Sequence, residues 1–97
     1  MGFLKNAAWS LAFKSCMVTI RDHSDKLVAH IEGGKPMTES AGGFGSAVDY
    51  GIKLEGELDN IRDMRRRDCI PDCRVQEAEA YAAKALALFR DAMPGLR

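Results

Sequence analysis

The sequence has no net charge, no long apolar run and few cysteine or histidine side chains. Its 97 residues include fourteen basic and fourteen acidic ones, so no global field draws the chain toward nucleic acid or an anionic membrane. The most apolar run, near the N-terminus, is interrupted by Lys5, Asn6, Ser10 and Lys14. It falls short of the roughly 20 apolar residues that a spanning helix needs. These absences predict a cytoplasmic protein with no membrane contact.

Cysteine and histidine are too scarce for a disulfide framework or a recognisable metal centre. Cys69 and Cys73 stand four residues apart, but Cys16, His23 and His30 form no second close pair of the kind that tetrahedral zinc requires. No serine or cysteine is tied by its spacing to a base. We therefore expect no enzymatic activity, no cofactor and no metal. A thiol or metal switch at Cys69 and Cys73 is an alternative function, and thiols that simply pack a turn are the favoured interpretation.

Apolar side chains recur at helical spacing throughout the C-terminal half. Ser46 is a good N-cap, and Asp49 stands where its carboxylate can complete a capping box. Gly51 opposes a helix by its propensity, yet it falls on the apolar stripe and so favours close approach of a neighbouring helix. The pattern predicts two helices, with stripes Ala47, Tyr50, Leu54, Leu58, Ile61 and Met64 in the first and Val75, Ala78, Ala82, Ala85, Leu86, Phe89 and Met93 in the second.

The stretch "RRRDCIPDC", residues 65–73, lies between these two predicted helices. Cations are favoured at the end of a helix, and Pro71 suits the first position of the next one. A connection this short predicts an antiparallel helical hairpin of about residues 46–67 and 72–93. The same arginines suggest a second function, a nucleic-acid-binding regulator that uses Arg62, Arg65, Arg66 and Arg67.

The N-terminal half permits two interpretations. The favoured one is a helix from residue 2 to about residue 20, packed across the hairpin, and then a short helix that Ser24 caps and Gly33 ends. The alternative is an α+β fold with a β-hairpin at about 16–32. In both cases residues 33–46 form a glycine-rich loop. We predict a mostly α fold in which residues 1–97 form a single small globular domain.

The first predicted helix carries two apolar stripes, whereas a surface helix in a small domain needs one. The first stripe is expected to pack on the hairpin and consists of Leu4, Ala7, Ala8, Leu11 and Val18. The second is expected to remain for another molecule and consists of Trp9, Phe13, Cys16 and Ile20. The expected interface residues are Trp9, Phe13, Met17 and Ile20. Aromatic residues and methionine are enriched in protein interfaces. We therefore predict a non-catalytic protein that binds a protein partner or forms a homodimer through this helix, as a regulator, adaptor or inhibitor of bacterial or phage type.

Overall fold

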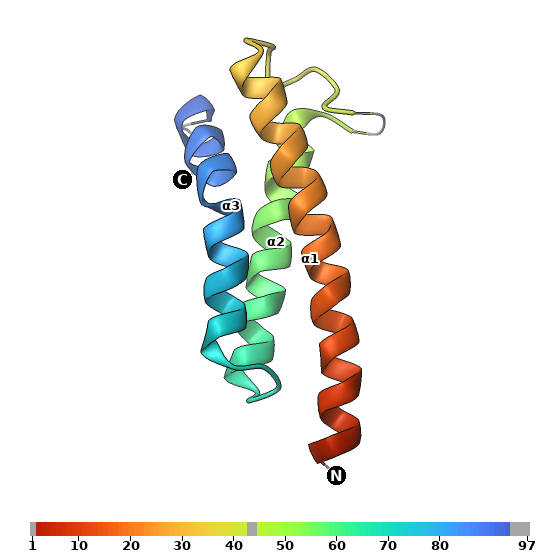
Figure 1. The fold of residues 1–97 in the computed structure, drawn as a ribbon. Coiled ribbons are helices and arrows are strands. Elements are labelled where there is room, and N and C mark those ends of the chain that lie inside the picture. The colour runs from red at the N-terminus through yellow and green to blue at the C-terminus, as the bar shows by residue number, and fades with distance from the viewer. Residues whose placement is uncertain (1, 43–44, 94–97) are drawn as a thin grey trace.

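Three helices make up the described part of the structure. The computed structural model describes residues 2–42 and 45–93, with side chains from residue 9 onward. The helices are α1 (Gly2–Glu32), α2 (Ala47–Arg66) and α3 (Asp72–Ala92). They lie side by side along a body of 49 × 25 × 17 Å, with α2 antiparallel to α1 and α3 (Figure 1). The prediction of a mostly helical fold is confirmed. The alternative β-hairpin at 16–32 is wrong, because this segment lies within α1.

The hairpin of α2 and α3 forms as its sequence predicts. Ser46 caps α2: its hydroxyl accepts a hydrogen bond from the Asp49 backbone N–H, and the Asp49 carboxylate accepts one from the Ser46 backbone N–H, both at 3.3 Å. The inner faces of the two helices pack against each other and against α1. Their buried residues are Ala47, Tyr50, Gly51, Leu54, Leu58, Ile61 and Met64 in α2 and Ala78, Ala82, Ala85, Leu86 and Phe89 in α3.

The connection between α2 and α3 is a helix-ending turn followed by a proline. Asp68 has a φ of 58°, and its N–H donates to the Arg65 carbonyl while the Cys69 N–H donates to the Met64 carbonyl, both at 2.9 Å. This pair of bonds defines a Schellman motif, in which the left-handed position is usually a glycine. Pro71 stands one position earlier than predicted, at the N-cap of α3, where it makes no side-chain cap.

Helix α1 is continuous through residues 21–24, where the sequence predicted a break. Ser24 is buried inside the helix and is not an N-cap. The reason is that one apolar stripe continues on both sides of it, since Ile20 and Leu27 lie four residues before and three residues after Ser24 and both are fully buried. Packing of a continuous stripe outweighs a local serine signal, because most helical stability in proteins comes from tertiary contacts.

The two apolar stripes of α1 are exchanged relative to the prediction. Phe13, Met17 and Ile20 are buried in the core that α1 forms with the hairpin. Leu11 and Val18, expected to pack on the hairpin, are instead 69% and 63% exposed. The expected packing was therefore wrong, and in this fold Phe13, Met17 and Ile20 are covered by their own chain.

The prediction that Gly51 permits close helix approach is confirmed. A Cβ atom at this position would lie 2.3–2.6 Å from three carbons of the Phe89 ring, far inside van der Waals contact. The aromatic ring of α3 therefore rests on the backbone of α2.

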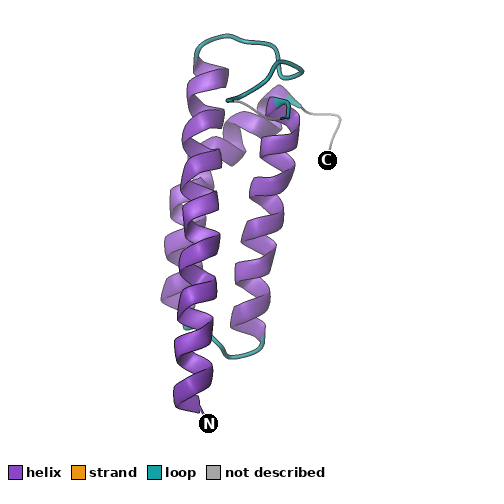
Figure 2. Cartoon of the chain, turned by 90° about the vertical axis from the view of Figure 1, so that its right-hand side faces the viewer, coloured by secondary structure: helices purple, strands orange, loops and turns teal. Residues whose placement is uncertain are grey.

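Helix α1 is longer than the hairpin beside it. It has 31 residues, whereas α2 and α3 have 20 and 21. Its N-terminal turns extend past the α2–α3 connection (Figure 2). None of the helices in the described part of the chain combines the length and apolar character needed to cross a membrane.

Candidate protein-binding surface on α1

The outward side of α1 carries uncovered apolar side chains. Leu11 and Val18 are seven residues apart, which places them on one side of the helix two turns apart. Leu4, Ala7 and Ala8, the other members of this predicted stripe, lie outside the part of the chain whose side chains are described. We call Leu11 and Val18 the outer stripe of α1.

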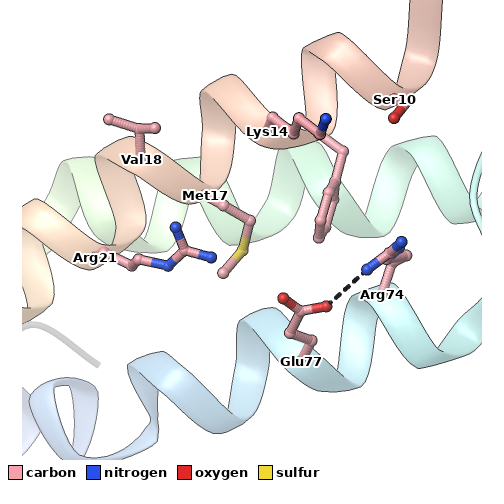
Figure 3. A pocket seen from close by; sticks show the side chains of 8 residues that line it. Ser10, Lys14, Met17, Val18, Arg21, Arg74 and Glu77 are labelled. Atoms are coloured by element: carbon pink, nitrogen blue, oxygen red, sulfur yellow. Dashed lines mark hydrogen bonds and ion pairs between the residues drawn. The ribbon is translucent and has the colours of Figure 1, made fainter. Parts of the chain in front are cut away.

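A groove lies beside the outer stripe, between α1 and the first turns of α3. Its floor includes Phe13 and Met17, and its volume is about 410 Å³. The side chains at its edges are Ser10, Lys14, Val18 and Arg21 from α1 and Arg74 and Glu77 from α3 (Figure 3). We call this the α1–α3 groove. Val18 belongs to both surfaces, so the outer stripe and the groove form one continuous face.

A second hollow continues the groove toward the α2–α3 connection. It shares Ser10, Phe13 and Arg74 with the first and ends at residues 68–71, with a volume of about 360 Å³. The two hollows together follow α1 from the middle of the molecule to the end of the hairpin.

Positive charge predominates along the α1–α3 groove. The Arg74 guanidinium lies 5.5 Å from the centre of the Phe13 ring and forms an ion pair with Glu77 at 3.1 Å. Neither Lys14 nor Arg21 has a carboxylate within 4 Å among the residues that the structure describes. The groove therefore has three cations and one carboxylate along its edges.

Asp25 of α1 and Tyr81 of α3 are in contact on the side of Arg21 that faces away from the groove. Burial raises the pKa of the Tyr81 phenol, the nearby Asp25 carboxylate adds to this effect, and Arg21 opposes it. The Tyr81 hydroxyl donates to Asp25 at 3.2 Å, so this contact joins α1 to α3 just beyond the end of the groove.

The arginines predicted to contact nucleic acid are all engaged in ion pairs. Arg62 contacts Glu79 at 2.9 Å and Asp59 at 3.0 Å, and its bond to Glu79 raises the pKa of the guanidinium. The remaining pairs are Arg65 with Asp72 and Asp68, and Arg66 and Arg67 with Asp63. Four guanidinium groups thus face five carboxylates, so this surface has no excess of positive charge. Nucleic-acid binding here stays a prediction.

The cysteines are not brought together into a reactive centre. Cys69 is buried in the turn, Cys73 is exposed in the first turn of α3, and neither forms a disulfide. The Cys69 thiol lies 3.6 Å from the Arg67 carbonyl oxygen, which fits its place in the Schellman turn. Burial, with the charge and hydrogen bonding of Glu57, raises the pKa of the Cys16 thiol. Within the described ranges, no three histidine, cysteine or acidic side chains cluster in a way that could hold a metal.

One polar cluster was missed by sequence reasoning. His23 stacks on Tyr50 with ring centres 4.6 Å apart and planes inclined by 28°. Its Nδ1 lies 3.4 Å from the Asp22 carboxylate but without hydrogen-bond geometry, and the buried Ser24 hydroxyl also has no partner among the described residues. The His30 Nε2 lies 2.8 Å from the Pro36 carbonyl oxygen. These contacts fasten α1 to α2 and to the loop after α1.

Sequence reasoning also missed the charged edge of the α1–α3 groove. Lys14 and Arg21 have the same seven-residue spacing as Leu11 and Val18, and this spacing is the signal that could have placed the two cations on one side of α1. Arg74 and Glu77 carry no such signal, because only the packing of α3 against α1 brings them to the groove.

Comparisons of this chain with protein-family models, with curated proteins and with solved structures found no match.

Proposed function

We propose that this chain is a non-catalytic, cytoplasmic protein that acts by docking on another protein, as a small regulator, adaptor or inhibitor. The contact surface is the outer stripe of α1 together with the α1–α3 groove, and not the inner residues Phe13, Met17 and Ile20. The observation that carries the proposal is the exposure of Leu11 and Val18 beside the α1–α3 groove.

The physical argument concerns apolar side chains that the monomer leaves exposed to solvent. Burying apolar surface is favourable by roughly 25 cal/mol per Å², and α1 already buries one complete stripe against the hairpin. Leu11 and Val18 contribute little to the monomer, because 69% and 63% of their surface is exposed. Their burial becomes favourable once a partner covers them, and a groove alongside allows the partner's side chains to interdigitate.

Site-specific photocrosslinking in the native host tests the proposal. Benzoylphenylalanine replaces Leu11 or Val18 in one pair of variants, and it replaces Ile52 in the matched control, because Ile52 is 53% exposed on α2. We expect a discrete covalent adduct from positions 11 and 18 and at least fivefold less of it from position 52.

The mass of the adduct identifies the occupant, a different protein or a second copy of this chain. An adduct from position 52 that equals or exceeds those from positions 11 and 18 contradicts the proposed surface. Circular dichroism of the three variants shows whether each retains its helices, so a lost adduct is not confused with lost folding.

A further inference from the structure

The charges that surround the α1–α3 groove identify the kind of partner that fits it. Lys14 and Arg21 lie on the same edge, seven residues and roughly 10 Å apart along the helix axis, with no carboxylate of the described residues within 4 Å. On the opposite edge the charges of Arg74 and Glu77 offset each other at 3.1 Å. The unbalanced charge of the groove is therefore positive and lies along α1.

The dimensions of the groove suit a helical segment. From Ser10 to Arg21 it follows α1 for twelve residues, a rise of about 16 Å or three turns. A helix docked in a groove contacts it through side chains spaced three, four and seven residues apart. Three turns provide that spacing once, which is enough for three apolar anchors.

The apolar contact comes mainly from the rim of the groove. Phe13 and Met17 form the floor but are only 6% and 2% exposed, so they offer little area for a partner. Val18, on the edge beside Lys14 and Arg21, offers far more. A partner must therefore place its apolar side chains against Val18 and its charged side chains next to the two cations.

We propose that the α1–α3 groove binds an amphipathic helix of a partner protein, with a row of apolar side chains flanked by carboxylates that meet Lys14 and Arg21. This inference rests on the proposed function, because it names the chemistry of the partner for that same surface. Complementary charge at such a surface adds association rate and selectivity more than raw affinity. Binding should accordingly weaken as salt is raised, since exposed charges are screened.

Fluorescence anisotropy with two designed peptides tests the charge requirement. Both peptides are helical and carry leucines at i, i+4 and i+7; one has flanking glutamates and the other has lysines in their place. We expect saturable binding of the acidic peptide to the full chain, at least tenfold weaker binding of the lysine peptide, and weaker binding of the acidic peptide at 300 mM than at 50 mM salt.

A pair of charge-reversal variants provides the matched control. Lys14→Glu with Arg21→Glu should weaken the acidic peptide at least tenfold. Lys35→Glu with Lys53→Glu changes the net charge by the same amount at two exposed lysines outside the groove and should leave binding within twofold. Circular dichroism verifies that both double variants are folded.

Three results would overturn the inference. They are equal binding of the two peptides, an equal loss in both double variants, and no saturable binding of the acidic peptide up to 1 mM. Sedimentation separates this failure from failure of the proposed function. If the chain self-associates, and Leu11→Ser with Val18→Ser abolishes this while no acidic peptide binds, the occupant is a second copy and the proposed surface stands.

Discussion

Helices α1 and α2 lie side by side and each buries one apolar stripe, but their outward faces differ. The outward face of α2 is largely polar, and its C-terminal arginines are held in ion pairs with Asp59, Asp63 and Asp68. Among the residues of α2, all of which the structure describes, Ile52 is the one large apolar side chain that is strongly exposed. The outward face of α1 carries Leu11 and Val18 beside a positively charged groove. The monomer therefore leaves one large apolar side chain of α2 strongly exposed, whereas on α1 it leaves Leu11 and Val18 exposed on the same side.

The largest expected effect separates the two faces of α1. Ile20→Ala should lower the free energy of unfolding by about 2–5 kcal/mol, because it leaves a cavity in the core. Val18→Ala, two residues away, should change it by less than about 0.5 kcal/mol, as surface substitutions usually do. Urea unfolding followed by circular dichroism measures both. Equal losses at the two positions would show that the inner and outer stripes are wrongly assigned.

The next-largest effect separates the buried face of α2 from its exposed face, with one glycine on each. Gly51→Ala should cost about 1–3 kcal/mol, the range for an overpacked core, because its new methyl group would displace the Phe89 ring. Gly56→Ala should stabilise the protein by about 0.4–1 kcal/mol, since a Cβ there meets no atom within 4 Å. Thermal unfolding of both variants checks the opposite signs. A stabilised Gly51→Ala variant would contradict the close approach of α3.

The smallest effect compares one serine from each helix. Ser46→Ala should lower stability by about 1 kcal/mol, the usual cost of a lost N-cap. Ser24→Ala should cause no loss, because its hydroxyl is buried without a hydrogen-bond partner among the described residues and alanine is the better helix former. Guanidinium unfolding of the two variants measures both changes, provided that the dependence of the unfolding free energy on denaturant concentration is the same in each. A loss at Ser24 equal to that at Ser46 would mean that the Ser24 hydroxyl makes a stabilising bond.

The hairpin was predictable because its signals are local and agree with one another. The Ser46 cap, the stripe that follows it and the short connection before Pro71 each lie within a few residues, and each points to the same pair of helices. The role of Gly51 was also predictable, because a glycine on the buried stripe of a helix leaves room for a neighbouring element to approach its backbone. The Schellman turn was missed, since Asp68 occupies the position that usually identifies it by a glycine.

Helix α1 was harder to predict because it carries two apolar stripes that both have helical spacing. Either stripe could face the hairpin by periodicity alone. The larger side chains of Trp9, Phe13 and Met17 suggested a partner, whereas Phe13 and Met17 lie in the core and Trp9 is partly buried against it. Ser24 looked like a cap because its type is common at helix starts. Only the continuation of the stripe from Ile20 to Leu27 shows that the helix passes through it.

The candidate surface, like α1 itself, was only partly predictable from the sequence. The sequence indicated that α1 has more apolar residues than one face requires, which pointed to the helix that carries the exposed stripe. It could not indicate which of them remain uncovered, nor that Arg74 and Glu77 complete a groove with Lys14 and Arg21.

The sequence by itself determined where the helices of the hairpin begin and end, because hydrogen bonds and caps are formed by residues close together in the chain. The tertiary structure alone decided which side of α1 is inside and which residues of α3 lie opposite it. Burial depends on side chains that meet across long sequence separations, and a two-sided helix leaves that choice to the fit of the larger side chains against the rest of the core.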